Sequence, residues 1–484
     1  MTFFNQIRTR ESGGTGMSRK TRQSVLRAKL DDMVTGIREQ IASGQLNDGD
    51  FLPSELELAE RYEISKHSVR KGLDLLVEQG YVLKVPRIGN KANRPEQKPA
   101  AVLRLGYYPS MWRQAALPEL VKLYRQRHPD IGVELIPIPF KFDDLHLMQH
   151  YLDSGMIDVA MFNQLSFGEL QESGKLKELL EPLEPSEELY PFLLPAFREE
   201  GLLHALPFVF SPVVLGYNKD HFAEYDLPEP DSSWTWSDLQ RVAAEIGREN
   251  KRVGFYYHAL SDNRWPIFLL QSGEPLSAGD AGHVDFSGSG VREAIRMSRD
   301  VLNDQGLTSL LSQSDGEAEE LFRNGKITMI MTTYFGLNLF TDAPFRFDIA
   351  PLPALRTNYT LNLVVGLAVS AKSAHKEEAK QLVRELTSLD YQSLIRRRTL
   401  SIPALKKAAE RGADPEHPAL ACEPSRFMLY REIIRSFRLH SDLQLSGEAL
   451  KRMRSELKLY WAGVTDLDVC CSGLEDALAV RPIG

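Results

Sequence analysis

The sequence predicts an α/β protein made of two parts that differ in character. From about Val25 to Glu78 apolar residues recur at helical spacing, and a short β pattern follows as far as Asn93. From Val102 onward short apolar segments such as VLRLGYY and MIDVAMF alternate with amphipathic helical segments. That alternation is typical of a mostly parallel sheet covered by helices. A chain of 484 residues with 43% hydrophobic residues has room for roughly two to four domains.

Composition divides the chain into four segments. Residues 1–20 are polar and rich in Gly, Ser and Thr, and we expect a disordered leader there. Residues 21–93 carry the helical pattern and are predicted to be the first domain. The stretch NRPEQKPAA has no periodicity, so residues 94–101 are predicted to be a linker. Residues 102–484 form the second, larger domain.

The first domain is predicted to hold a helix-turn-helix followed by a β-hairpin. After a first helix that Gly44 ends, a second helix begins behind Ser54, with Glu57 placed to complete a capping box. A third helix runs from Ser65 to Gly80. The segment YVLKVPRIGNKAN then reads as strand, turn and strand, which makes a wing beside the helices.

The third helix concentrates basic residues in its first two turns, namely Lys66, His67, Arg70 and Lys71. Cations at a helix N-terminus face the positive end of the helix dipole, so a group outside the helix must compensate. Phosphates in a DNA groove would do so, whereas a solvated helix face is the alternative. Ser18 to Arg94 holds 14 lysines and arginines against 11 acidic residues, although the whole chain carries a net charge of −8. The basic wing favours DNA binding over a solvated face.

The segments LPSELELAERY and SKHSVRKGLDLLVEQG, with the wing behind them, resemble the winged helix-turn-helix of the GntR family of bacterial regulators. The resemblance implies a DNA-binding domain, and we expect the DNA contacts to come from helix ends, the recognition helix and the wing. The predicted contact residues are Ser54, Lys66, His67, Ser68, Arg70, Lys71, Arg87 and Gly89. Two features depart from the family pattern: Leu56 stands where many members carry an arginine, and the wing has RIGN in place of a Gly-x-Gly-Thr turn.

In the second domain aromatic and amide residues follow the predicted strands. VLRLGYY leads to Trp112, and MIDVAMF leads to Asn163. Ligands of open α/β sheets bind beyond the carboxyl ends of the strands. Aromatic faces with amides beside them suit the apolar faces and hydroxyl groups of a sugar. Core packing is the alternative for each single aromatic residue.

The second domain resembles the carbohydrate-type (family 1) extracellular solute-binding proteins over nearly all of residues 102–484. The most distinctive stretch is HALPFVFSPVVLGYNKDHFAEYDLPEPDSSWTWSDL. The resemblance implies a periplasmic-binding-protein-like domain of two lobes that close over a ligand, with a hinge near Pro207–Ser211 and Ile349–Pro353. The predicted ligand residues are Trp112, Phe162, Asn163, Phe210, Tyr257, Trp265, Tyr334 and Phe335. Trp234 and Trp236 are expected to pack a helix, and Asp262 with Arg264 are either polar contacts or a surface pair.

The sequence therefore predicts a DNA-binding transcription regulator that responds to a small polar solute, with a carbohydrate as the expected effector. Double-stranded operator DNA is its expected partner, a homodimer its expected state and the cytoplasm its expected location. No apolar stretch of the kind that a signal peptide needs occurs near the start, and the cysteines Cys422, Cys470 and Cys471 are expected to be reduced thiols.

Two other functions stay open at this point. One is the solute-binding component of a transporter, which would need export. The other is a fusion of the GntR type with an aminotransferase, which would need a lysine that holds a cofactor in a Ser-x-x-Lys type of loop. Neither that loop nor a phosphate-binding, zinc-protease or nucleophile-elbow motif occurs in the sequence, so we expect no enzyme, no cofactor and no metal.

Overall fold

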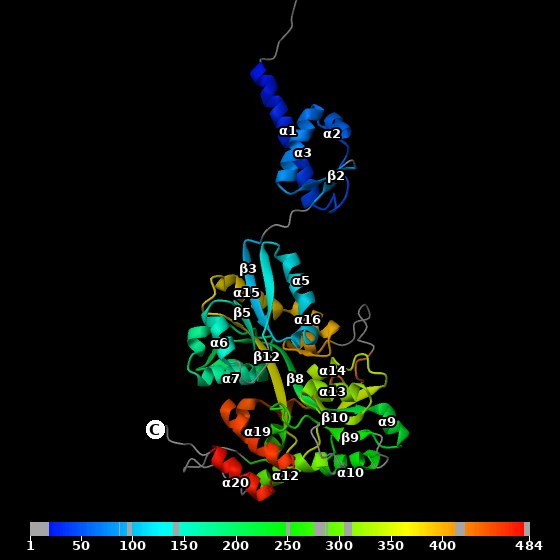
Figure 1. The fold of residues 1–484 in the computed structure, drawn as a ribbon, viewed down its shortest axis with the longest axis vertical. Helices are drawn as coiled ribbons and strands as arrows, with labels where there is room; N and C mark the ends of the chain where they lie inside the picture. Colours follow the sequence, from blue (N-terminus) through cyan, green and yellow to red (C-terminus); the bar gives the residue numbers. More distant parts are fainter. Residues whose placement is uncertain are drawn as a thin grey trace, which may run out of the picture. The chain divides into compact units, whose positions relative to one another are not determined.

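The chain divides into two units, Met1–Lys98 and Pro99–Gly484, and each is described by itself. The computed structural model describes residues 19–86, 88–93, 99–138, 145–247, 252–274, 286, 289–303, 312–411 and 422–478. Most of the predicted leader (residues 1–18) and most of the predicted linker (residues 94–98) lie outside the described residues. Both units are drawn in Figure 1.

The first unit packs three helices against a small hairpin. Its elements are α1 (Arg19–Ala42), α2 (Glu55–Arg61), α3 (Lys66–Glu78), β1 (Val82–Val85) and β2 (Gly89–Ala92). A single apolar core, which includes Ile37, Leu58 and Leu73, joins the three helices to the hairpin. Helices α1 and α3 approach closely at Gly72, where an added Cβ would lie 2.3 Å from Met33 Cε. The unit is thus a helix-turn-helix with a two-stranded antiparallel wing.

Local sequence signals fix where α2 and α3 begin. The Ser54 side chain accepts a hydrogen bond from the backbone N–H of Glu57, and the Glu57 carboxylate accepts one from the backbone N–H of Ser54. This capping box satisfies two N–H groups that the helix itself leaves unpaired. Ser65 caps α3 by accepting from the backbone N–H of Ser68 at 3.2 Å.

The second unit is built on one long mixed sheet. The strands follow the order β4-β3-β5-β12-β8-β10-β9, and three short strands outside this path pair with β8 (β11 and β13) or with β12 (β14). The strands of this sheet are β3 (Ala101–Tyr107), β4 (Ile131–Pro137), β5 (Val159–Asn163), β8 (Leu206–Asn218), β9 (Val253–Tyr256), β10 (Ile327–Thr333), β11 (Phe347–Ala350), β12 (Thr360–Val369), β13 (Ile402–Pro403) and β14 (Phe437–Arg438). Strands β6 (Arg198–Glu199) and β7 (Leu202–Leu203) pair with each other in a separate two-stranded sheet.

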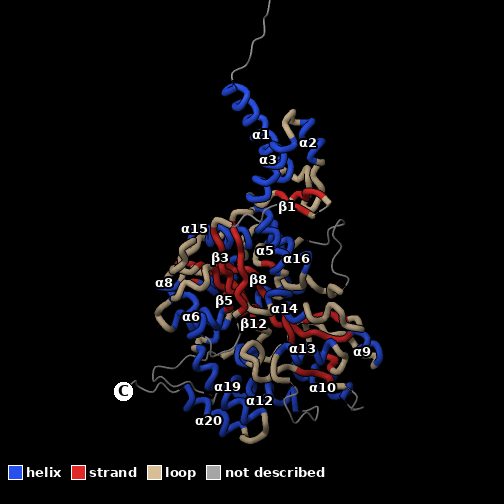
Figure 2. Tube along the Cα trace, turned by 45° about the horizontal axis from the view of Figure 1, so that its top comes forward, coloured by secondary structure: helices blue, strands red, loops and turns tan. Residues whose placement is uncertain are grey.

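Helices cover this sheet in two groups, as Figure 1 and Figure 2 show. The first lobe, around β3, β4 and β5, holds α4 (Met111–Gln114), α5 (Leu117–Arg127), α6 (Leu145–Asp153), α7 (Gln164–Glu172), α8 (Leu176–Leu179), η1 (Pro191–Phe197), α15 (Lys376–Leu386), α16 (Leu389–Arg398) and α17 (Lys406–Ala409). The second lobe, around β9 and β10, holds α9 (Lys219–Glu224), α10 (Trp236–Gly247), α11 (Pro266–Gln271), α12 (Ser289–Asn303), α13 (Asp315–Arg323) and α14 (Tyr334–Leu337). The chain ends through α18 (Leu429–Glu432), η2 (Ile434–Ser436), η3 (His440–Leu443), α19 (Gly447–Trp461) and α20 (Leu467–Leu478).

Two long strands, β8 and β12, run through both lobes. From Leu206 to Pro212 strand β8 pairs with β12, and from Val213 to Asn218 it pairs with β10 and β11. Every residue of β8 is buried. The change of partner lies directly behind Pro207–Ser211, the first of the two segments expected to form a hinge. Because each lobe holds one half of β8, this strand links the two halves of the site described below.

Candidate functional site

The basic residues of α3 lie on the exposed side of the first unit. The side chains of Lys66, His67, Arg70 and Lys71 are exposed, whereas Val69, Leu73 and Leu76 on the other side of the helix are buried. Arg70 is also partly engaged, because its Nε donates to Glu55 Oε2 at 2.8 Å. Since 63% of the Arg70 side chain is exposed, water screens this pair and a phosphate could compete for the guanidinium.

The other residues predicted to contact DNA have different local roles. The hydroxyl of Ser54 is used by its capping box, and the hydroxyls of Ser65 and Ser68 lie 3.0 Å apart at the start of α3. Gly89 opens β2 with a φ of +149°, a conformation that side chains other than glycine rarely adopt. Arg87 lies outside the described residues.

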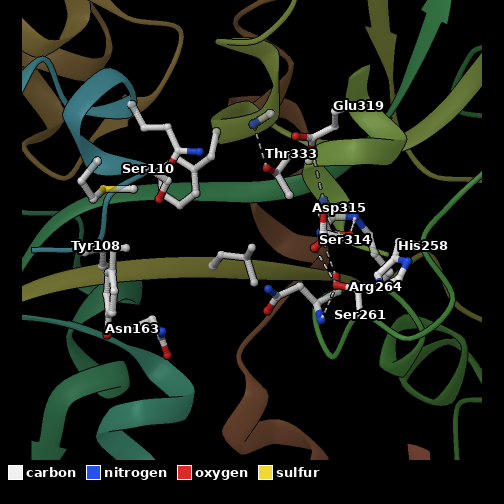
Figure 3. Close-up of a pocket in the computed structure, with 18 of the residues that line it drawn as sticks. Tyr108, Ser110, Asn163, His258, Ser261, Arg264, Ser314, Asp315, Glu319 and Thr333 are labelled. Carbon is white, nitrogen blue, oxygen red and sulfur yellow. Dashed lines mark hydrogen bonds and ion pairs between the residues drawn. The ribbon is translucent and has the colours of Figure 1, made fainter. Parts of the chain in front are cut away.

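The second unit contains a cavity of about 1110 Å³ between its lobes. The first lobe contributes the segment from Tyr108 to Gln114 and the start of α7. The second lobe contributes the loop that follows β9 and the N-terminal ends of α13 and α14. Figure 3 shows Tyr108, Ser110 and Asn163 on one side, with a polar group from the second lobe facing them. The segment Leu363–Val365 of β12 lines the space between them.

Three of the eight predicted ligand residues line this cavity: Trp112, Asn163 and Phe335. The Trp112 side chain is 51% exposed and its ring lies 6.1 Å from that of Tyr107. The Asn163 side chain caps α7 by accepting from the backbone N–H of Ser166 at 2.9 Å, and Phe335 donates its backbone N–H to Ser211 Oγ. These residues are therefore held in place by the elements that carry them.

The other five predicted ligand residues are buried in the cores of the lobes, and none of them is among the residues that line the cavity: Phe162, Phe210, Tyr257, Trp265 and Tyr334. The polar atoms of the last three are used inside the protein. Tyr257 Oη donates to the carbonyl oxygen of Ser298, Trp265 Nε1 donates to Asp262, and Tyr334 Oη donates to the carbonyl oxygen of Phe427.

Four of these five buried residues have a neighbour in the chain that does line the cavity. Asn163 follows Phe162, His258 follows Tyr257, Arg264 precedes Trp265, and Phe335 follows Tyr334. In the strand β5 adjacent side chains point to opposite sides, so Phe162 fills the core while Asn163 faces the cavity. In the other three pairs the chain turns or enters a helix, and one residue of each pair again lines the cavity while the other is buried. Trp234 and Trp236 are buried away from the cavity, as expected for residues that pack a helix.

A cluster of charged groups forms the wall that the second lobe gives to the cavity. Arg264 is 3% exposed and donates to the carbonyl oxygens of Met331 at 3.1 Å and Asn263 at 3.3 Å. Its Nη2 lies 3.5 Å from Glu319 Oε1, and its Nε lies 3.6 Å from Asp315 Oδ1. Burial raises the pKa of Glu319 to about 7, although the positive charge of Arg264 acts in the opposite direction. Figure 3 shows this group on one wall.

A second polar group joins the C-terminal segment to both lobes. His440 lies between Gln164 of the first lobe and the loop after β9 in the second: its Nδ1 is 3.0 Å from Gln164 Oε1, and its Nε2 is 3.0 Å from the carbonyl oxygen of Asp262. Arg454 of α19 is paired with the Asp262 carboxylate. Asp262 and Arg264 are both buried and bond to different partners, so they do not form a surface pair.

The sequence interpretation missed the carboxylates of this wall. A signal for them exists, because Ser314 and Glu317 have the spacing of a helix start and the Ser314 side chain does cap α13. A helix beginning there places Asp315 and Glu319 four residues apart on one face. Glu319 also lies beside Ala318 and Phe322 on the apolar side of that helix, which marks it as a buried charge.

Some features are absent from the described part of the chain. No described helix is long and apolar enough to cross a membrane. Within the same residues, no cluster of three or more His, Cys, Asp or Glu side chains could hold a metal ion. The three cysteines are free thiols.

Family models match both parts of the chain. The model described as bacterial extracellular solute-binding protein matches residues 108–393, and the model described as bacterial regulatory proteins, gntR family, matches residues 31–91. The second match covers the later part of α1, then α2, α3 and nearly all of the wing, and the first spans most of both lobes.

Individual relatives match one part or the other. A binding protein of Brucella abortus (strain 2308) is 25% identical over 228 residues, which are 45% of this chain and 54% of the relative, so the chain spans about half the length of this relative. The mannitol-binding protein of Pseudomonas aeruginosa is 25% identical over 58% of this chain and 67% of its own length. The arabinose metabolism transcriptional repressor of Geobacillus stearothermophilus is 32% identical over 17% of this chain and 21% of its own length.

Solved structures share the fold of the second unit. An ABC substrate-binding protein of Listeria monocytogenes in complex with cycloalternan superposes with a TM-score of 0.66 at 22% identity, covering 78% of this chain and 98% of its own. Maltose-bound MalE3 of T. maritima gives a TM-score of 0.68 at 18% identity, covering 78% of this chain and 99% of its own. The chain therefore belongs to the bacterial extracellular solute-binding protein family and carries a gntR-family domain in front of its two-lobed unit.

Proposed function

We propose that this protein is a DNA-binding transcription regulator that responds to a small polar solute, namely a carbohydrate, held between the lobes of its second unit. One observation carries the proposal: a single chain joins a gntR-family domain to a solute-binding-protein domain with a cavity between its lobes. Each half has an apolar core of its own, so their fusion favours a function that uses both.

The exposed cations of α3 support the DNA half of the proposal. Lys66 and Arg70 occupy the first turns of the helix, where a recognition helix meets bases and phosphates of the major groove. A homodimer would place two such helices in successive major grooves of a roughly twofold-symmetric operator. DNA as partner also implies that the protein works in the cytoplasm.

The cavity supports the ligand half of the proposal. Its volume of about 1110 Å³ is slightly above the ordinary range for small-molecule sites, about 300–1,000 Å³. Aromatic rings of Tyr108, Trp112 and Phe335 line it together with amide and hydroxyl groups. Such a lining suits a sugar, and the relatives include a mannitol-binding protein.

A transporter component is the second candidate. It is favoured by the extent of the match to the solute-binding family, which covers residues 108–393. The two candidates differ in one property, because a transport receptor has no need to bind DNA. Specific DNA binding by the full chain would therefore decide between them.

The test begins with DNA fragments selected from a random pool by the purified full chain. In mobility-shift assays, Lys66→Ala and Arg70→Ala should each weaken binding and reduce the slope of log affinity against log salt by about one, since each removes roughly one phosphate contact. Lys29→Ala is the matched control, because Lys29 of α1 is paired with Glu63. Unchanged binding by both α3 variants would overturn the assignment of the recognition helix. A sugar that stabilises the protein but leaves its DNA affinity unchanged would overturn the regulatory role.

A further inference from the structure

The charged wall of the cavity points to the kind of ligand that the second unit accepts. We infer that Glu319 contacts the ligand through Oε2, and that the cavity selects uncharged, hydroxyl-bearing solutes over anionic ones such as sugar acids and sugar phosphates. This inference deepens the proposed function and rests on it.

The position of Glu319 is fixed by its surroundings. Thr332 Oγ1 donates to Glu319 Oε1 at 2.9 Å, and Arg264 Nη2 approaches the same oxygen at 3.5 Å. Gly336 lies against the carboxylate, since a Cβ there would be 2.1 Å from Oε1. Among the described residues no side chain or backbone N–H donates a hydrogen bond to Oε2. Oε2 is thus the carboxylate oxygen left for a ligand in a cavity that Glu319 lines.

The arginines of the cavity are poor receptors for an anion. Arg264 is committed to two carbonyl oxygens and the carboxylate of Glu319, and Arg454 is committed to Asp262. Each of the three side-chain nitrogens of Arg264 already donates within the protein, and the charge of Arg454 is paired with the Asp262 carboxylate, so the two-pronged contact that arginine makes with carboxylates and phosphates would have to displace these partners. Arg113 also lines the cavity, but its side chain is exposed, so water and salt screen its charge.

The remaining groups on this wall also disfavour negative charge. Asp315 and Glu319 are two carboxylates that share Arg264. Burial lowers the pKa of His258, so this cavity residue adds no positive charge at neutral pH. The N-terminal end of α13 is offset in part by Asp315 and is capped by Ser314. An anionic ligand would therefore meet like charge at a buried carboxylate, which is costly.

A hydroxyl group suits Glu319 in either of its protonation states. With a pKa of about 7, raised by burial, both forms exist near neutral pH. The ionised carboxylate only accepts hydrogen bonds at Oε2, and the neutral acid can donate one. A hydroxyl both donates and accepts, whereas a ligand carboxylate can pair only with the neutral acid.

The experiment compares matched ligands by thermal unfolding and calorimetric titration of the full chain. The probes are D-glucose, D-galactose and D-mannose, each with its uronic acid and its 6-phosphate, together with mannitol, maltose and their phosphates. We expect binding by one or more neutral members and at least tenfold weaker binding by the anions derived from the same sugar. An anion that binds as tightly as its neutral parent would overturn the inference.

Variants then test the role of Glu319 itself. Glu319→Gln should weaken the binding of the neutral ligand about tenfold, as expected for a lost hydrogen bond to a charged group. It should also reduce the ratio between the dissociation constant of the uronic acid and that of its neutral sugar. Glu320→Gln is the matched control, since Glu320 lies on the same helix and pairs with Arg323. A loss of protein stability alone would weaken the binding of both ligands equally. The ratio of the two dissociation constants therefore reports the contact between Glu319 and the ligand. If Glu319→Gln does not fold, the comparison of neutral and anionic ligands on the wild-type chain still decides the selectivity.

The outcomes separate this inference from the proposed function. Equal ligand ratios for Glu319→Gln and Glu320→Gln would overturn the role of Glu319. No binding by any probe would count against both the inference and the proposed sensor. A neutral sugar that binds without changing DNA affinity would overturn the proposed regulation and leave the inference standing.

Discussion

Two buried histidines of the second unit make its stability depend on pH. His440 lies between Gln164 and Asp262, and His221 Nδ1 lies 2.9 Å from Thr328 Oγ1. Burial lowers the pKa of each imidazole to about 4, from an ordinary value near 6.5. Between these values the unfolded chain binds more protons than the folded one, so stability falls as the pH falls from 6.5 towards 4.

Replacing one histidine should remove the contribution of that histidine to the pH dependence of stability. We predict that His440→Gln lowers the slope of unfolding free energy against pH by up to about 1.4 kcal/mol per pH unit between pH 4 and 6.5, equivalent to one proton. Urea unfolding at several pH values measures this slope. Ser232→Ala, at an exposed position without an ionisable side chain, should leave the slope unchanged. A slope that is the same in all three proteins would contradict the assignment.

Glu319 makes the stability change with pH in the opposite direction. Its pKa of about 7 in the folded state lies above the ordinary value of 4.5, so its contribution to stability is present at low pH and is lost as the pH rises from 4.5 through 7. The histidine variant is therefore compared with the wild type at each pH, because the total slope mixes both kinds of group. His440 and Glu319 both line the cavity, and burial there shifts their two pKa values so that their effects on stability oppose each other between about pH 4.5 and 6.5.

At the scale of elements, the sequence predicts the strands better than it predicts how they meet. The apolar segments VLRLGYY, MIDVAMF and ITMIMTT coincide with β3, β5 and β10. Strand β10 is buried throughout and β5 nearly so, whereas β3 exposes Val102 and Arg104 at its start, and the apolar character that this burial requires is visible in a single sequence. The path of β8 through both lobes is not visible there, since it depends on pairing with β12, β10 and β11.

The candidate site shows the same limit. Strand ends led to Trp112, Asn163 and Phe335, which do line the cavity. For the aromatic residues one place away, such as Tyr257 and Tyr334, the direction of the side chain depends on backbone geometry that the pattern of apolar residues does not contain. The carboxylates of α13 do not follow a strand in the sequence, and only the fold brings the N-terminal end of this helix to the strand ends at the cavity.

Packing between α10 and β9 gives a prediction at the element scale. A Cβ on Gly254 of β9 would lie 2.2 Å from the carbonyl oxygen of Ala243 and 2.5 Å from its Cα, so the helix backbone rests directly on the strand. We predict that Gly254→Ala destabilises the second unit by about 1–3 kcal/mol or more, because backbone atoms must move.

The matched control lies on the helix of the same pair. An added Cβ on Gly247, the last residue of α10, has no atom within 4 Å, so Gly247→Ala should be neutral or stabilise by up to about 1 kcal/mol. Urea unfolding midpoints of the two variants measure the difference. Equal stability of both variants would show that α10 and β9 are farther apart than described.

At the scale of the whole molecule, a regulator of the proposed type must couple two units that have separate cores. The apolar core of the first unit and that of the second share no residue. A ligand can shift the DNA-binding equilibrium only if it binds more tightly to one of the two functional states. The cavity is built entirely from the second unit, so the direct effect of ligand on stability belongs there.

We predict that calorimetry of the full chain shows two unfolding transitions, a smaller one for the first unit and a larger one for the second. A sugar should raise the midpoint temperature of the larger transition only. At about 100 times its dissociation constant, a ligand should stabilise the second unit by about 2.7 kcal/mol. Gly254→Ala identifies the transition of the second unit, since it should lower the midpoint temperature of the larger transition and leave that of the smaller one unchanged. DNA that binds the first unit should raise the smaller transition instead. A single transition that ligand, DNA and Gly254→Ala all move together would contradict this prediction, because it would show that the two units unfold as one cooperative body.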